Sequence, residues 1–254
     1  MRTDRVQITY DLTFLTPFHF GTGIRAGLVD RTVVRDAEGY LYVPGSTIKG
    51  VLRERCEQLA RLSTQDKPRL SSPHDPKAAL ADLGTQPPTL ITRIFGSQIA
   101  PGRLYFDDAS QDEQIKQLYD HPEPRIQSKY REMQVDLYTQ VRLDRLTRTA
   151  VPGALYTSEF GVNETVFQGS VQGWLTCTPL DASEQAPTYS LLLLLAGLRM
   201  LDRLGGNKST GKGQCSCEIT GIQLNTQEIR TEIWLEWLGQ IGRLADVRLE
   251  GGER

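Results

Sequence analysis

Apolar and polar residues alternate along the first part of the chain. Over residues 6–15 the apolar side chains recur at every second position, which is the period of a strand with one buried face. A second apolar stretch, residues 41–43, runs into Pro44-Gly45-Ser46, and apolar residues then recur at helical spacing as far as Leu62. This pattern predicts a strand, a stop and a helix that begins near Ser46.

Two polar stretches interrupt the pattern. Residues 63–90 hold five prolines among Ser, Thr, Asp and Lys, and residues 109–136 are again polar with little periodicity. We interpret both as surface insertions and extend the first to about residue 99. Between them, residues 102–107 are predicted to form a short strand.

The second half of the chain is predicted to form further strands and helices. Two strand arms, 138–146 and 155–160, are expected around a turn at 151–154. The remaining predicted elements are a strand at 166–177, a helix at 188–204 that stops at Gly205-Gly206, a strand at 214–222 and a C-terminal helix at 227–246 in which Trp234 and Trp237 are packing anchors. This order of elements is typical of an α+β, ferredoxin-like domain enlarged by insertions.

Composition narrows the class of protein. The 254 residues include 29 Lys and Arg against 31 Asp and Glu, a net charge of -2, which argues against a uniformly basic nucleic-acid binder. The longest apolar run has eight residues (191–198), far short of the roughly 20 that span a bilayer, and the amino terminus shows no apolar stretch resembling a signal peptide. The four cysteines lack zinc-site spacing, so we expect reduced, mostly buried thiols in a cytoplasmic protein with no membrane partner.

The predicted helix start carries unusual charges. Acidic residues are expected in the first turn of a helix, because its free N–H groups make that end positive. Here Gly45 and Ser46 are followed by Lys49, with Arg53 four residues further on the same face. The arrangement suits a docked anion such as phosphate. An ordinary capped helix with solvated Lys49 and Arg53 explains it equally well.

A glycine-rich segment follows the helix predicted at 188–204. The pattern from Gly206 to Gly211-Lys212 matches most of a nucleotide-binding phosphate loop. The next residue is Gly213 rather than Ser or Thr, and the segment lies between a helix and a strand instead of between a strand and a helix, so nucleotide hydrolysis is disfavoured. Its amides and the side chains of Lys208, Ser209 and Lys212 suit a phosphate backbone. The alternative is a flexible connection with incidental lysines.

A third segment, residues 21–31, follows the first predicted strand. It holds three glycines and ends in Asp30-Arg31. On the residues alone, we expect Asp30 to form an ion pair with Arg25 or Arg31.

Taken in order, these segments resemble the CRISPR-associated RAMP superfamily, and within it the backbone subunits of type III RNA-guided effector complexes. The matching segments are 19–23, Asp30, 42–50, 94–96, 102–109, 143–147, Glu159 and 205–213.

The resemblance implies one RAMP domain over residues 1–254, built as a modified ferredoxin-like, RNA-recognition-motif-like palm with a β-hairpin thumb. The implied parts are a palm (1–62, 100–108 and 160–223), insertions (63–99 and 109–136), a thumb (138–161) and a C-terminal helix (227–246). The implied partners are a guide RNA, a target RNA and other subunits of the effector complex. Guide phosphates would be held by Gly45, Ser46, Lys49, Arg53, Gly206, Lys208, Ser209 and Lys212.

In the slicing members that this chain resembles, an aspartate after the first strand cuts the target RNA with a divalent metal. Asp30 stands at the matching position and would be both the catalytic and the metal-binding residue, with Mg²⁺ as the expected ion. Magnesium keeps several waters and borrows ligands from substrate phosphates, so one carboxylate can suffice. Only RNA would be cut, because DNA lacks the 2′-hydroxyl nucleophile.

Two alternatives stay open. A structural subunit of the same complex would share every RNA contact and lack cleavage at Asp30. A metal-independent, guide-processing endoribonuclease would need a histidine base. Of the three histidines, His74 and His121 lie in the polar insertions, so His19 is the candidate base, and packing beside the loop is its alternative role.

Overall fold

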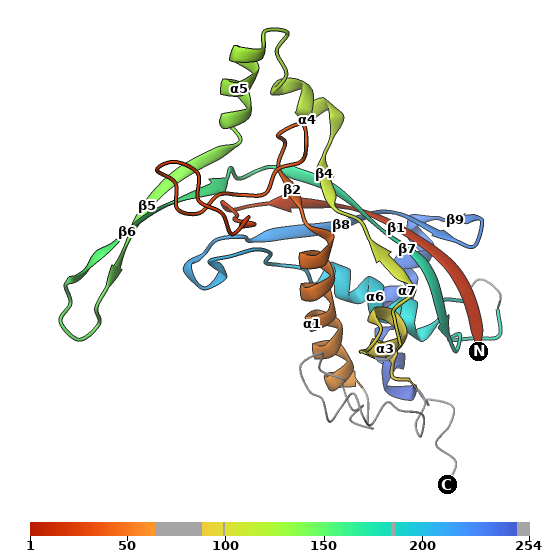
Figure 1. The fold of residues 1–254 in the computed structure, drawn as a ribbon. Coiled ribbons are helices and arrows are strands. Elements are labelled where there is room, and N and C mark those ends of the chain that lie inside the picture. The colour runs from red at the N-terminus through yellow and green to blue at the C-terminus, as the bar shows by residue number, and fades with distance from the viewer. Residues whose placement is uncertain (64–87, 99, 184–185, 248–254) are drawn as a thin grey trace.

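The fold is an antiparallel sheet covered by helices on one face (Figure 1). The structure is a computed structural model that describes residues 1–63, 88–98, 100–183 and 186–247. Within those residues the main sheet has seven strands in the order β2-β4-β7-β1-β8-β9, with β3 also paired to β7. Its strands are β1 (Arg2–Phe14), β2 (Tyr42–Val43), β3 (Leu104–Phe106), β4 (Ala109–Gln111), β7 (Val166–Cys177), β8 (Cys215–Leu224) and β9 (Gln227–Ile229).

Strand β1 lies at the centre, between β7 and β8. Its alternating apolar residues face the helices and are buried, which confirms the strand predicted at 6–15. Tyr10 is paired with Gly169, where an added Cβ would lie 2.6 Å from the Tyr10 ring. The missing side chain therefore makes the room that the Tyr10 ring occupies in the core.

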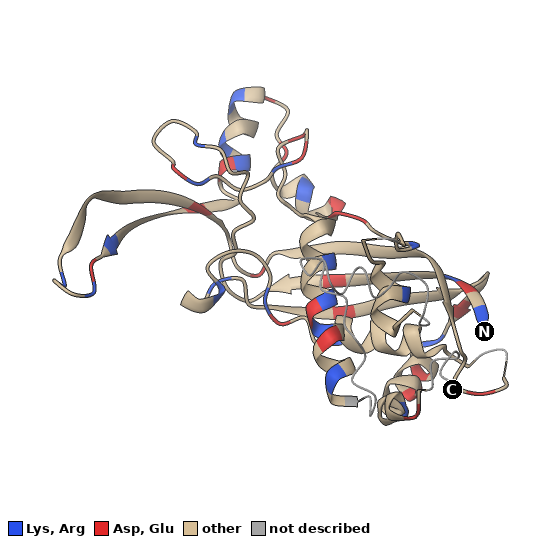
Figure 2. Ribbon diagram, turned by 60° about the horizontal axis from the view of Figure 1, so that its bottom comes forward, with Lys and Arg blue, Asp and Glu red and all other residues tan. Residues whose placement is uncertain are grey.

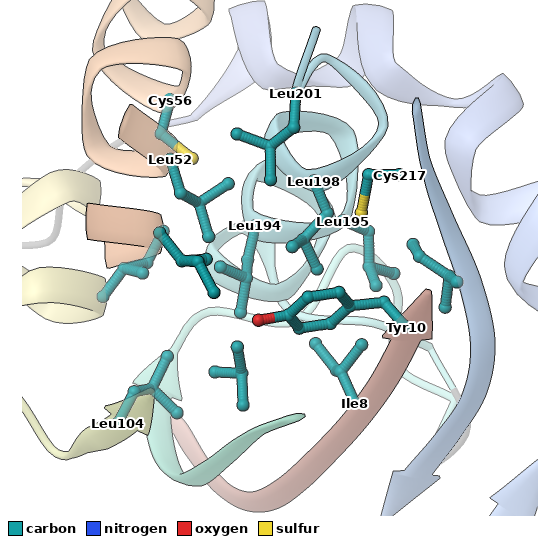
Figure 3. Packing of buried hydrophobic residues seen from close by; sticks show 14 of the residues in the cluster. Ile8, Tyr10, Leu52, Cys56, Leu104, Leu194, Leu195, Leu198, Leu201 and Cys217 are labelled. Carbon is teal, nitrogen blue, oxygen red and sulfur yellow. The ribbon is translucent and has the colours of Figure 1, made fainter. Parts of the chain in front are cut away.

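The covering helices are α1 (Gly45–Ser63), α3 (Leu90–Phe95), α6 (Tyr189–Arg199) and α7 (Thr231–Gly239). Cys56 of α1 lies against α6, near Leu198 (Figure 3). The two helices approach closely at Gly197, where an added Cβ would lie 2.5 Å from the Cys56 sulfur. Burial raises the pKa of the Cys56 thiol. All four cysteines of the sequence fall in described segments and are free, buried thiols, as predicted.

The chain order β1, α1, β3, β7, α6, β8 is that of a ferredoxin-like fold. The sheet places β1 between β7 and β8 and puts β3 beyond β7, so the predicted α+β palm is confirmed. No helix in the described segments is both long enough and apolar enough to cross a membrane.

Several predicted element bounds differ from the structure. The insertion assigned to 63–99 contains α3, whose Ile91 and Ile94 are fully buried, and the insertion assigned to 109–136 begins with the sheet strand β4. Both segments are too short for periodicity to separate them from a loop. Helix α6 ends at Arg199, five residues before Leu204, and the predicted C-terminal helix includes β9 and a final 3₁₀ turn (Ile241–Asp246). Trp234 and Trp237 are buried anchors as expected, and residues 64–87 of the first insertion lie outside the described residues.

The thumb is a two-stranded hairpin of β5 (Val135–Leu143) and β6 (Ala150–Gly161) that projects from the palm (Figure 1). Its turn lies at residues 144–149, not at 151–154 as predicted. The Asp144 carboxylate accepts the N–H groups of Leu146 and Thr147, and Arg148 adopts a left-handed conformation with φ of 57°. An Asp that bonds the backbone two and three residues ahead starts a turn without proline or glycine.

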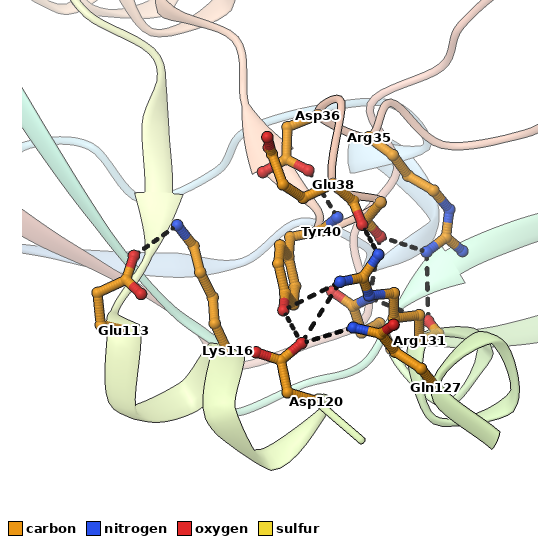
Figure 4. A network of polar contacts seen from close by, with 11 residues as sticks. Arg35, Asp36, Glu38, Tyr40, Glu113, Lys116, Asp120, Gln127 and Arg131 are labelled. Carbon is orange, nitrogen blue, oxygen red and sulfur yellow. Dashed lines mark hydrogen bonds and ion pairs between the residues drawn. The ribbon is translucent and has the colours of Figure 1, made fainter. Parts of the chain in front are cut away.

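Helices α4 (Glu113–Leu118) and α5 (Pro124–Glu132) form a small polar layer beside the thumb base. It is tied to the loop before β2 by a network around Tyr40 (Figure 4). The Tyr40 hydroxyl donates to Asp120, Arg131 also bonds Asp120 at 3.4 Å, and the Arg131 guanidinium lies 4.7 Å from the Tyr40 ring centre. The second insertion therefore holds the segment that leads into β2 and α1.

Candidate nucleic-acid interface

The loop after β1 is a small hairpin. Gly21 pairs with Val33 at its base and Ala26 pairs with Val29 near its tip. The Thr22 N–H donates to Thr32 at 3.0 Å. This pairing gives the segment a defined shape, although its glycines and exposed side chains look like those of an irregular loop.

The outgoing arm of this hairpin, residues 30–33, pairs with thumb strand β6. The Asp30 N–H donates to the Thr157 carbonyl at 2.9 Å, and the Glu159 N–H donates to the Arg31 carbonyl at 2.9 Å. The Glu159 carboxylate accepts the Val33 N–H at 2.9 Å. Asp30 is therefore held at the base of the thumb by backbone pairing.

The Asp30 carboxylate has two different partners. Oδ2 accepts the Thr157 N–H at 3.0 Å, while Oδ1 lies 3.5 Å from Nε of Arg25. The Asp30 side chain is 29% exposed and the Arg25 side chain 80% exposed. Of the two arginines expected as partners, Arg25 pairs with Asp30, and a catalytic or metal-binding role of Asp30 stays a prediction.

Protein ligands for a metal are few at this site. In the described segments no three or more His, Cys, Asp or Glu side chains converge in a way that could hold an ion. Asp30 offers a single carboxylate, and within the described part of the chain its Oδ1 meets one partner, the exposed Arg25. That donor set fits a magnesium ion that keeps most of its waters and takes phosphate oxygens, and it does not fit an all-protein cage.

The start of α1 is already partly capped. The Gly45 N–H donates to the Asp108 carboxylate at 2.7 Å, so this amide is committed within the protein. An added Cβ on Gly45 would lie 2.2 Å from the Phe106 carbonyl oxygen, which explains the glycine by packing. Ser46 is exposed and its N–H donates to no acceptor among the described residues, so Ser46 is the residue of this turn that can still meet an anion.

The two basic residues predicted on α1 have protein partners. Lys49 Nζ lies 5.6 Å from the centre of the Phe106 ring, and Arg53 pairs with Glu57 at 3.0 Å. From Arg53 onward, basic and acidic residues alternate along α1 (Figure 2). No acidic side chain in the described segments pairs with Lys49, which keeps its charge beside the helix start, whereas Arg53 shares the Glu57 carboxylate with Arg61, which lies 3.8 Å from it.

The glycine-rich segment is anchored at both ends to the residues after β1. The Gly206 N–H donates to the His19 carbonyl at 2.8 Å and the Gly213 N–H donates to the Pro17 carbonyl at 2.9 Å. Between these anchors, Asn207 is left-handed with φ of 60° and a 3₁₀ turn covers Lys208–Thr210. The Lys208 and Ser209 amides donate to no acceptor in the described structure, and successive free amides of this kind form an anion-binding concavity.

The residues predicted to bind phosphate in this segment therefore differ in exposure and in their contacts. Gly206 is an anchor, whereas Lys208 and Ser209 are exposed at the tip. Lys212 points at the thumb, with Nζ 4.1 Å from the ring centre of Tyr138 and 5.2 Å from that of Phe160. Lys212 thus places one positive charge between the glycine-rich segment and the thumb base.

His19 connects thumb strand β6 to the glycine-rich segment. It is 6% exposed, its Nδ1 donates to the Glu159 carbonyl at 2.8 Å, and its own carbonyl holds Gly206. Burial lowers the pKa of His19, although the hydrogen bond to Glu159 opposes the shift. The residue packs beside the loop, and its burial disfavours a role as an exposed general base.

The sequence did not single out the partners that position these groups. Thr157 acts through its backbone amide, which leaves no signal in a sequence. Tyr138 and Phe160 look like ordinary strand residues, and only their place opposite Lys212 distinguishes them. Helix α5 is a further, mostly basic element beside the thumb (Figure 2); its polar, proline-flanked sequence had been assigned to an insertion.

Comparison with known proteins identifies one family. A family model described as the RAMP superfamily matches residues 11–216. A protein of Methanocaldococcus jannaschii named CRISPR system Cms endoribonuclease Csm3 is 25% identical over 199 residues, which cover 75% of this chain and 68% of that protein.

Solved structures with the same fold include two cryo-EM chains. One comes from Type III-B Cmr-beta bound to cognate target RNA, with 14% identity, a TM-score of 0.54 and coverage of 84% of this chain and 96% of that one. The other comes from the apo state of Type III-B Cmr-beta, with 12% identity, a TM-score of 0.56 and coverage of 84% and 97%. At these identities the likeness shows a shared fold.

Proposed function

This chain belongs to the RAMP superfamily, and from that premise we propose that it is an RNA-binding backbone subunit of a type III CRISPR effector complex. Its partners are a guide RNA, a target RNA and the other subunits of that complex. The proposal is supported by the relative named Csm3 and by the fold shared with Cmr-beta chains, one of them in a structure bound to target RNA.

We further propose that the subunit cuts the target RNA at Asp30. The observation that carries this proposal is the attachment of Asp30 to the thumb through Thr157. If the thumb wedges into the guide–target duplex and displaces a base of the target, the carboxylate lies beside the distorted nucleotide. Backbone pairing keeps it there, because Asp30 and the thumb base form one hydrogen-bonded unit.

The proposed reaction is an internal transesterification. The 2′-hydroxyl oxygen of the displaced nucleotide attacks the adjacent phosphorus, a P–O2′ bond forms and the P–O5′ bond breaks. The products are a 2′,3′-cyclic phosphate and a 5′-hydroxyl, since the 2′ proton is lost to solvent and the leaving oxygen takes up a proton. A bound divalent ion supplies charge stabilisation at the phosphate. Asp30 provides the negative charge that such an ion needs, and the Thr157 amide orients it.

Guide binding is assigned to the α1 start and the glycine-rich segment. Ser46, Lys208 and Ser209 are exposed and have the free amides or charge that phosphates need. Lys49 and Lys212 add positive charge, and Gly45, Arg53 and Gly206 serve chiefly as shape and anchoring residues. Base pairing supplies the sequence specificity, while the protein holds the backbone.

The decisive experiment uses the assembled complex with guide-matched RNA labelled at one end. Asp30→Asn should abolish magnesium-dependent cleavage while target binding, measured in EDTA, stays unchanged. Cleavage at the parent rate in Asp30→Asn would overturn the catalytic assignment. If the parent complex binds target without cutting it, the chain is the structural form of the subunit, an alternative favoured by the engagement of both Asp30 oxygens within the protein.

A further inference from the structure

Arg25 and Asp30 face each other across the small hairpin after β1. The contact is a single one of 3.5 Å between Nε and Oδ1, and the arginine is 80% exposed. Exposed ion pairs are weak, because solvent screens them and the long side chain loses freedom. Gly23 and Gly27 flank Arg25 with positive φ values of 77° and 57° and no atom within 4 Å of an added Cβ. Arg25 can therefore leave Asp30 at little cost.

The two oxygens of Asp30 are not equivalent. Oδ2 is bonded to a backbone amide of the thumb, and this bond is part of the pairing that holds the arm in place. Oδ1 has only Arg25. An incoming cation would have to take Oδ1, and two positive charges do not share one exposed oxygen favourably. Arg25 must then move to another anion.

The proposed function supplies such an anion, a phosphate of the bound RNA. A guanidinium stays charged at all relevant pH values and presents paired N–H donors that match phosphate oxygens. The neighbouring Arg31 is worse placed for this exchange. It follows Asp30 directly in the paired arm, so its side chain points to the opposite face, and its charge acts on His19, whose pKa it helps to lower.

We propose that Arg25 exchanges between Asp30 and the target RNA: it neutralises the Asp30 carboxylate in the RNA-free protein, and it binds the phosphate beside Asp30 once target RNA is in place. The proposal rests on the function proposed above. It makes Arg25 a phosphate-binding residue of the cleavage site and gives the free subunit a blocked carboxylate.

The exchange predicts opposite effects of one substitution. In the RNA-free full-length protein, Arg25→Ala should bind Mn²⁺, measured by electron paramagnetic resonance, about two- to fivefold more tightly than the parent, because a competing cation is gone. The matched control Arg31→Ala removes the same charge one residue from Asp30 and should show a smaller change. The double variant Arg25→Ala/Asp30→Asn should lose the gain.

In the assembled complex the same variant should be impaired. Arg25→Ala should cleave guide-matched RNA about 10- to 100-fold more slowly, and the salt dependence of target binding in EDTA should fall by about one phosphate contact. Arg25→Lys keeps the charge without the paired donors, and it should recover part of the cleavage rate and part of the salt dependence. Unchanged Mn²⁺ affinity together with unchanged target binding in Arg25→Ala would overturn the exchange.

The two proposals fail in different ways. If the parent complex does not cut RNA, the catalytic function fails, yet the Mn²⁺ titration and the salt dependence still decide whether Arg25 exchanges. If the parent complex cuts RNA and Arg25→Ala matches it in rate, in Mn²⁺ affinity and in salt dependence, only the role of Arg25 is rejected. The melting temperature of each variant controls for folding and should match the parent, because the Arg25 side chain is exposed.

Discussion

Asp30 Oδ2 accepts the backbone N–H of Thr157 at 3.0 Å, and the Asp30 N–H donates back to the Thr157 carbonyl at 2.9 Å. The two residues are 127 positions apart in the chain. Both hydrogen-bonding groups of Thr157 are thus used by the arm that carries Asp30, not by the partner thumb strand. Asp30 is consequently placed by the thumb as much as by the palm.

The Thr157 amide can be removed selectively. Thr157→Pro deletes the donor to Asp30, and the ladder with β5 should survive because this amide points away from it. We expect the Asp30 arm to loosen and cleavage of target RNA to slow, with guide binding retained. Thr157→Val is the matched control, since it keeps the amide and the branched shape and should cleave like the parent. Equal cleavage rates of the two variants in a labelled-RNA assay would contradict the positioning role.

Two glycines in α1 should respond in opposite directions. Gly45→Ala places a Cβ 2.2 Å from the Phe106 carbonyl, so the free energy of unfolding should fall by about 1–3 kcal/mol. Gly50→Ala meets nothing within 4 Å and should raise it by about 1 kcal/mol through better helix propensity. Urea denaturation measures both changes.

Guide binding provides a second readout for Gly50. If RNA approaches this turn closely, Gly50→Ala should weaken guide binding even though it stabilises the fold. Unchanged guide affinity would show that the RNA backbone keeps its distance from residue 50.

Lys208 and Lys212 should differ despite lying in one loop. Lys208 is exposed at the loop tip, so Lys208→Ala should weaken guide binding, lower the salt slope by about 0.7–0.9 and leave the melting temperature unchanged. Lys212 also contacts the Tyr138 ring, so Lys212→Met should cost about 0.5–1 kcal/mol of stability as well. Filter binding over a salt series and thermal denaturation separate the two effects. Equal melting temperatures for both variants would mean that the ring contact contributes nothing.

The pH dependence of stability should reveal the protonation of the buried His19 ring. Its folded-state pKa lies below the ordinary value of 6.5 because burial penalises the charged ring. The unfolded chain therefore binds a proton more readily, and stability is lost as pH falls through 6.5 towards the folded-state pKa. His19→Asn keeps a donor for the Glu159 carbonyl and removes the titration. Melting temperatures measured between about pH 8 and about pH 5 should fall less steeply in this variant than in the parent. Parallel curves would contradict the assignment.

Local patterns were sufficient for the parts of the fold that bury one continuous face. The alternation in β1 and the helical spacing in α1 depend only on neighbouring residues, and β7 matches its predicted bounds at both ends. Short elements were missed because a local pattern needs several residues to become visible. Helix α3 and strand β4 each span too few residues to show a period, and their place in the core depends on what packs against them.

The sequence by itself determined the ferredoxin-like order of elements, the buried thiols, and the three segments in which glycine, lysine and aspartate gather. Only the tertiary structure decided what those segments do to one another: Asp108 takes the Gly45 amide, Lys212 lies over Tyr138, and Asp30 is shared between Thr157 and Arg25. Hydrophobic periodicity is a property of adjacent residues and can be read along the chain. Hydrogen bonds and ring contacts between distant residues depend on strand pairing and loop geometry, so they exist only once the chain has folded.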